Sequence, residues 1–129
     1  MTNQIQNSNN QTGRKYDLIE RTLAFSKQII NFYNQLPKTN PVHTLADQLL
    51  RSGTSIGANY SEANEASSKK DFINKIYIAK KEAKETQYWI QLIAETFPAV
   101  KITARLLWKE AQELNLILAA IIRSAKGSN

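Results

Sequence analysis

Residues 51–93 decide the fold of this chain and read RSGTSIGANYSEANEASSKKDFINKIYIAKKEAKETQYWIQLI. Small residues, acids, lysines and aromatics follow one another here at helical spacing. From Ser68 onward an apolar stripe recurs at alternating steps of four and three residues, which predicts a helix beginning near Lys69. Ser68 and Asp71 approximate a capping box at its start. The stripe consists of Phe72, Ile76, Ala79, Ala83, Thr86, Ile90 and Ile93.

The first part of this stretch belongs to a preceding predicted helix, with Asn40 as its N-cap and Pro41 as its first residue. Its middle holds small residues that form helices poorly, and each Gly costs about 1 kcal/mol against Ala. Two interpretations follow. Either the backbone packs closely against neighbours, with hydroxyls bonded to carbonyls one turn back or to another helix, or the helix is kinked or broken. The small residues are Ser52, Gly53, Thr54, Ser55, Gly57 and Ala58.

Two further helices are predicted, one on each side of these. The first covers residues 14–36 and ends before Pro37, with an apolar stripe of Leu18, Thr22, Phe25, Ile29, Phe32 and Leu36. Additional apolar residues make the apolar surface of this helix wider than one neighbouring helix can cover, which indicates a second buried face. These residues are Ile19, Leu23, Ile30 and Tyr33. The last helix follows Pro98, with Thr96 as a candidate N-cap, and carries Val100, Ala104, Leu107, Ala111, Leu114, Leu118, Ile121 and Ala125.

Four helices joined by short connectors predict an all-α fold, an antiparallel up-down-up-down four-helix bundle. The length of 129 residues suits one domain with one core. We expect this domain to cover residues 14–126. Residues 1–13 are nearly all Asn, Gln, Ser and Thr and are predicted to form a flexible tail, and residues 127–129 a short C-terminal tail.

Composition narrows the classes of function. There is no Cys and a single His, His43, and neither a Glu-x-x-His motif nor a Gly-rich phosphate loop is present, so no metal or cofactor is expected. No apolar run is long enough to span a membrane and no secretory signal is visible, which favours a cytoplasmic protein without membrane contact. The formal charge of +6 and pI near 9.6 favour polyanionic partners.

Several short motifs in fixed order resemble one bacterial family: residues 53–59 (GTSIGAN), 61–63 (SEA), 68–72 (SKKDF), 81–83 (KEA), 85–86 (ET) and 88–89 (YW). This series resembles the four helix bundle protein family, also called the 23S rRNA intervening sequence protein or S23 family. The likeness is close from Leu45 to Ile93, and elsewhere it extends only to length and pattern. Gly57 and Tyr60 stand where the family often has Pro and Ile or Val.

The resemblance implies a ring-like homopentamer of four-helix protomers around a central channel. It also implies a similarity to the accessory protein of diversity-generating retroelements, which binds nucleic acid together with a reverse transcriptase. Such a pentamer would account for the wide apolar arc of residues 14–36. Five copies would carry about +30, a strong field for RNA or DNA.

Basic side chains near the motifs are the candidate nucleic-acid-binding residues: Arg51, Lys69, Lys70, Lys80, Lys81 and Lys84. The alternative is a solvated helix face balanced by Glu82 and Glu85, with Lys81 and Glu85 paired at i,i+4. Ser55, Asn59 and Glu62 form a polar motif that we expect to be structural, fixing the register of packed helices or subunits. Tyr88, Trp89 and Trp108 are expected in the core or at a subunit interface rather than stacked on bases.

The sequence therefore predicts a non-enzymatic oligomeric scaffold or adaptor that binds RNA or DNA, alone or with a nucleic-acid-processing protein. One alternative is a protein–protein interaction module without nucleic acid. Another is a Mg²⁺-dependent nucleotide pyrophosphohydrolase, since residues 62–65 and 82–85 each carry a Glu-x-x-Glu pair that could hold the metal.

Overall fold

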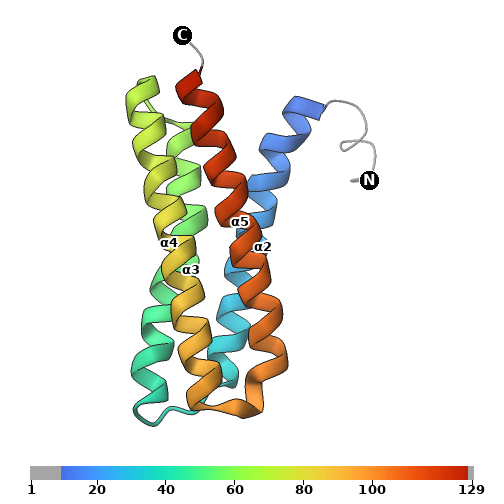
Figure 1. Ribbon diagram of the computed structural model, residues 1–129, viewed down its shortest axis with the longest axis vertical. Coiled ribbons are helices and arrows are strands. Elements are labelled where there is room, and N and C mark those ends of the chain that lie inside the picture. Colours follow the sequence, from blue (N-terminus) through green and yellow to red (C-terminus); the bar gives the residue numbers. More distant parts are fainter. Residues whose placement is uncertain (1–9, 128–129) are drawn as a thin grey trace.

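The computed structural model describes the backbone of residues 10–127 and the side chains of residues 18–127. Within this range the protein consists of four α-helices and one 3₁₀ turn, with no strand, which confirms the all-α class. The elements are α2 (Asn10–Gln35), α3 (Val42–Asn64), α4 (Lys69–Thr96), η1 (Pro98–Val100) and α5 (Lys101–Gly127). Figure 1 shows them side by side, with the first part of α2 leaning away from the other three helices.

The ends of the domain differ from the prediction. Helix α2 begins at Asn10 rather than Arg14, so residues 10–13, predicted as part of the flexible tail, lie in a helix. At the other end α5 extends through Gly127. The rest of the predicted tails, residues 1–9 and 128–129, lies outside the described residues. None of the helices within residues 10–127 is both long enough and apolar enough to cross a membrane.

Helix α3 is continuous through its small residues, so the alternative of a broken helix is wrong. The two glycines face α2. A Cβ on Gly53 would lie 2.9 Å from Cγ1 of Ile29, and one on Gly57 would lie 3.1 Å from Cβ of Thr22. A side chain at Gly53 would overlap Ile29, and one at Gly57 would crowd Thr22, so glycine permits this close approach of the two helices.

The hydroxyls of this segment bond as the first interpretation predicts. Thr54 Oγ1 donates to the carbonyl of Leu50 at 2.7 Å, and Ser55 Oγ donates to that of Arg51 at 2.6 Å. Ser52 reaches a neighbouring helix, because its Oγ accepts a hydrogen bond from Thr86 Oγ1 of α4 at 2.9 Å in the buried interior. The bond between Ser52 and Thr86 satisfies polar groups where α3 and α4 pack closely.

The predicted caps have mixed outcomes. Ser68 is confirmed as the N-cap of α4, since its hydroxyl accepts from the Asp71 N–H at 3.0 Å. The Asn40 cap is wrong. Pro41 precedes α3 without a side-chain cap bond, because the Asn40 carboxamide oxygen instead accepts from the Thr44 hydroxyl at 2.7 Å. The Thr96 cap is also wrong, because α4 continues through Thr96 and η1 separates it from α5.

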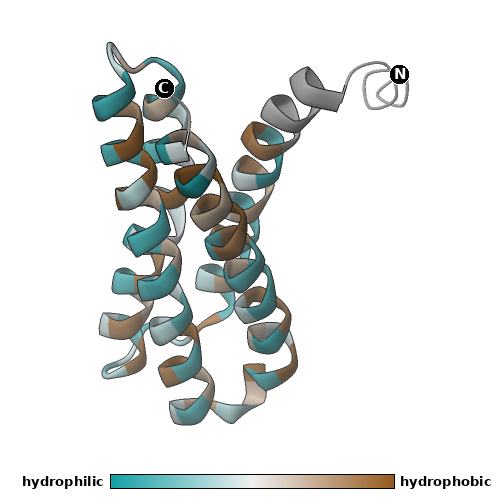
Figure 2. Cartoon of the chain, turned by 45° about the horizontal axis from the view of Figure 1, so that its top comes forward, coloured by the Kyte–Doolittle hydropathy of each residue, from teal (hydrophilic) through white to brown (hydrophobic). Residues whose placement is uncertain are grey.

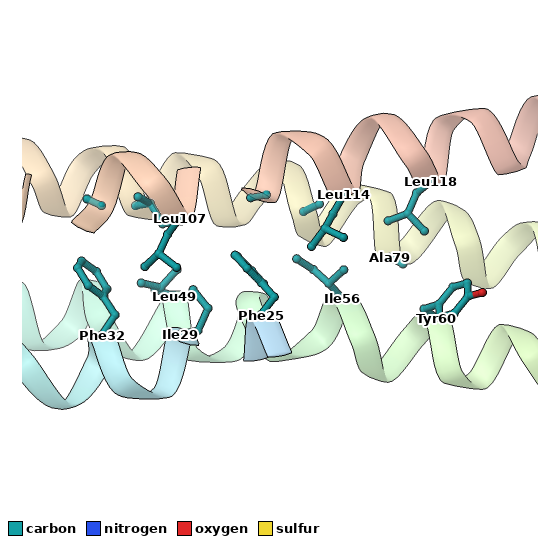
Figure 3. Packing of buried hydrophobic residues seen from close by; sticks show 14 of the residues in the cluster. Phe25, Ile29, Phe32, Leu49, Ile56, Tyr60, Ala79, Leu107, Leu114 and Leu118 are labelled. Carbon is teal, nitrogen blue, oxygen red and sulfur yellow. The ribbon is translucent and has the colours of Figure 1, made fainter. Parts of the chain in front are cut away.

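The core runs along the interior of the bundle, where Figure 3 shows side chains from α2 and α3 meeting those from α5. Phe25, Ile29 and Phe32 are at most 1% exposed, and the predicted inner stripe of α4 is buried from Ile76 to Ile93. In α5 the residue buried in the last turns is Ile122 rather than the predicted Ile121. Figure 2 shows hydrophobic and hydrophilic stretches alternating along the helices, as amphipathic packing requires.

Candidate nucleic-acid interface

Two acidic side chains of α4 contact α3. Arg51 of α3 lies between two carboxylates of α4, with its Nη1 3.2 Å from Oε1 of Glu82 and its Nη2 bound to Oε2 of Glu85. The indole N–H of Trp89 donates to the same Glu85 oxygen at 3.1 Å. Arg51 is therefore engaged with two carboxylates of α4.

The environment of Glu85 lowers its pKa. Burial acts in the opposite direction, but hydrogen bonds from Trp89 and Arg51 and the positive charges of Arg51 and Lys81 outweigh it. The predicted i,i+4 contact between Lys81 and Glu85 is thus a longer-range attraction, since within residues 18–127 no ion pair within 4.0 Å joins the two. A carboxylate with a lowered folded-state pKa contributes stability above its unfolded pKa, and this is lost as pH falls through the folded value.

Replacing Arg51 with Met should lower the free energy of unfolding by up to about 1 kcal/mol near pH 7, the usual upper value for a partly exposed ion pair. The difference between the two proteins should shrink as pH falls below the ordinary carboxyl range, because wild-type Glu85 then becomes protonated and the variant has no such pair to lose. Urea unfolding of both proteins at about pH 7, 5 and 3 measures this. A difference that stays constant across the series would contradict the assignment.

The polar motif of α3 is divided between two roles. The Asn59 carboxamide donates to the carbonyl of Ser55 in its own helix at 2.9 Å. Glu62 reaches α4, where it accepts from Lys75 Nζ at 3.0 Å, and this bond raises the pKa of Lys75. Within residues 18–127 no cluster of three or more His, Cys, Asp or Glu side chains is placed to hold a metal ion. The role of the motif in register stays a prediction.

Polar contacts join α4 to α5. The Asn115 side chain of α5 donates to the carbonyl of Lys80 at 3.0 Å, and Lys126 Nζ lies 2.9 Å from the Tyr77 hydroxyl. On α5, Lys101, Arg105 and Lys109 follow at steps of four residues, which places them on one side of the helix about 6 Å apart along its axis. The two helices thus bring basic residues from distant parts of the sequence to one side of the bundle.

Two hollows lie end to end between α4 and α5. The first, of about 570 Å³, is lined by Ile90, Gln91, Ala94, Glu95, Pro98, Lys101, Ala104, Arg105, Trp108 and Lys109. The second, of about 510 Å³, is lined by Lys81, Lys84, Glu85, Gln87, Tyr88, Gln91 and Trp108. Because Gln91 and Trp108 line both hollows, we treat them together as the α4–α5 groove. Five cations and two carboxylates line it.

None of the three aromatic residues lies fully in the core of the protomer. Tyr88 is 59% exposed and its ring meets that of Trp89 edge to face, with centroids 5.1 Å apart. Trp89 and Trp108 are half-buried. Trp89 and Trp108 pack against the core without being fully buried, whereas Tyr88 does not lie in the core. The subunit-interface alternative stays a prediction.

The structure brings only some of the predicted nucleic-acid ligands together. Lys81 and Lys84 line the groove with the α5 cations. Lys80 lies beside it, half-buried, on the same helix. Lys69 and Lys70 occupy the first turn of α4, which Figure 1 shows at the opposite end from η1. The sequence reasoning missed Lys101, Arg105 and Lys109, although their spacing of four residues was a readable signal.

Comparison with known proteins identifies the family. The model of the 23S rRNA-intervening sequence protein family matches residues 14–120. A crystal structure of a protein of unknown function from the S23 ribosomal protein family of Bacteroides thetaiotaomicron is 39% identical, covering 81% of this chain and 96% of that one, with a TM-score of 0.73. No functionally curated protein matches the chain. The chain therefore belongs to the 23S rRNA-intervening sequence protein family, also called the S23 family.

Proposed function

We propose that this protein is a non-enzymatic cytoplasmic scaffold whose antiparallel up-down-up-down bundles assemble into a ring-like homopentamer and bind RNA or DNA through basic surfaces. The observation that carries the binding proposal is the α4–α5 groove, where five cations meet two carboxylates. The charge of the whole chain, +6, acts in the same direction. Association would be mostly electrostatic and weakly dependent on base sequence.

Exposed apolar residues on α2 and α5 support self-association. They are Leu23 and Ile30 of α2, and Ile102, Leu106 and Leu116 of α5. Leu23 is 56% and Ile102 81% exposed. Soluble monomers rarely leave large apolar patches in water, and a repeated head-to-tail contact that closes gives a ring.

A hollow of about 550 Å³ lies between α2 and α5, and Phe25, Phe32, Leu106 and Leu107 contribute to its walls. Arg21 of α2 spans the two helices, with Nε 2.7 Å and Nη2 2.8 Å from the two carboxylate oxygens of Glu110. A second protomer covering this side would bury the apolar walls of the hollow. The α4–α5 groove lies on the other flank of α5 and would remain open to nucleic acid.

The test is a titration of the purified full-length protein into a fluorescently labelled RNA hairpin, read by anisotropy over a series of salt concentrations. Light scattering in the same buffer measures the mass of the particle. We expect a mass of about five protomers and a logarithm of affinity that falls steeply with the logarithm of salt, by several units of slope.

Two outcomes contradict separate parts of the proposal. A monomeric mass at micromolar concentration would contradict the proposed pentamer and the summed charge of its five copies. Absence of binding at low salt would remove the nucleic-acid role, leave the basic charge as a determinant of solubility, and favour the protein–protein interaction module.

A further inference from the structure

We propose that the α4–α5 groove binds single-stranded nucleic acid, with one base stacked on Trp108 and the flanking phosphates on Lys101, Arg105 and Lys109. Lys81 and Lys84 would receive the strand in the second hollow. This inference rests on the proposed function and names the site and the class of ligand. It differs from the sequence-based expectation, which placed phosphates along α3 and α4 and left Trp108 out of binding.

Charge complementarity identifies the ligand as a polyanion. Within residues 18–127, Lys101, Arg105 and Lys109 make no ion pair or hydrogen bond through their side chains. Of the two carboxylates in the groove, Glu85 is paired with Arg51, whereas Glu95 accepts only from the neutral Gln91 side chain at 3.3 Å and keeps its charge. Five cations against this one remaining carboxylate leave the groove with a net positive charge, which favours phosphates.

The two tryptophans differ in the way that a stacking site requires. Trp89 is fixed by its bond to Glu85 and by the Tyr88 ring. Trp108, in contrast, makes no hydrogen bond or ring contact within residues 18–127, and it lines both hollows. An aromatic side chain between lysines and arginines in a groove is the arrangement used to bind single strands without sequence preference.

The shape of the groove favours a single strand over a duplex. Its hollows of about 570 and 510 Å³ extend along the helices, and Ile90, Ala94 and Ala104 provide an apolar wall in the first of them. The faces of bases in a duplex are covered by their neighbours, whereas a single strand can turn a base into such a space. The phosphates would then lie along the row of cations on α5.

The test uses Trp108 as its own reporter. The chain has two tryptophans, so Trp89→Phe leaves Trp108 as the only one. Full-length protein with this change is titrated with a twelve-residue oligoadenylate, its DNA counterpart, and an abasic oligomer of the same length. We expect both base-containing oligomers to quench the fluorescence and to bind about tenfold more tightly than the abasic one.

Trp108→Ala in the otherwise wild-type protein should lower affinity for the oligoadenylate about tenfold by anisotropy and leave affinity for the abasic oligomer unchanged. Trp89→Phe is the matched control and should bind both like wild type. Circular dichroism and light scattering check that each variant keeps its fold and mass.

Three results would overturn the inference. Equal binding of abasic and base-containing oligomers, unchanged by Trp108→Ala, would leave the electrostatic proposal intact and remove the stacking site. Binding of the RNA hairpin without any binding of the single strands would move the nucleic-acid site elsewhere. Quenching by an acidic peptide but by none of the oligomers would assign the groove to a protein partner.

Discussion

Replacing Gly53 with Val should lower the free energy of unfolding by about 3 kcal/mol, because it places a branched side chain where α3 already touches α2. A Cβ at this position would lie 2.9 Å from Cγ1 and 3.0 Å from Cγ2 of Ile29. Both atoms are attached to the branching carbon of Ile29, which is 0% exposed, so no flexible end can swing away. The small gain in helix propensity offsets little of this.

Thermal unfolding followed by circular dichroism, at one fixed protein concentration, should show a fall in Tm of roughly 10 °C for Gly53→Val. The matched control is Gly127→Val in the last turn of α5, where an added Cβ meets nothing within 4 Å. That control should change stability by no more than about 0.5 kcal/mol. Equal Tm values for Gly53→Val and wild type would show that α2 and α3 do not pack through the glycine.

Replacing Lys101, Arg105 and Lys109 together with Gln should weaken binding of a single-stranded oligonucleotide about 100-fold near 0.1 M salt. Each phosphate contact on a single strand contributes about 0.7 to the salt slope, so three contacts change affinity by about two decades between 1 M and 0.1 M salt. The three side chains lie on the outside of the bundle and are exposed, so the fold should be unaffected. Anisotropy titrations measure the affinities.

The matched control removes the same number of charges elsewhere. Lys27, Lys70 and Arg123 are exposed on three different helices and do not line the α4–α5 groove. Replacing them with Gln should reduce affinity by less than about tenfold, because only the distant field changes. If this control weakens binding as much as the groove variant, net charge rather than the groove governs binding.

The fold could be predicted from the sequence because each helix carries a regular apolar stripe. The stripe of α4 from Ile76 to Ile93 is buried as predicted, and Ser68 caps the helix as its hydroxyl suggested. The start of α2 could not be predicted in this way. The polar composition of residues 10–13 is typical of flexible tails, but these residues belong to the helix. The composition of a short polar segment does not show whether a helix formed by the residues after it also includes that segment.

The candidate site was only partly predictable, because it depends on how helices are placed against one another. One interpretation of the sequence paired the lysines of α4 with Glu82 and Glu85 of the same helix. In the structure Glu82 and Glu85 instead form ion pairs with Arg51 of α3. Whether Trp108 shares a groove with Lys84 follows from the packing of α4 against α5, which periodicity along one helix cannot reveal.

The most direct test of the nucleic-acid role is the dependence of oligonucleotide affinity on salt, measured side by side for wild type and the Lys101, Arg105 and Lys109 variant. We predict a wild-type slope of log affinity against log salt that is steeper than that of the variant by about two, since three phosphate contacts are lost. Equal slopes for the two proteins would contradict the assignment of phosphates to the α4–α5 groove.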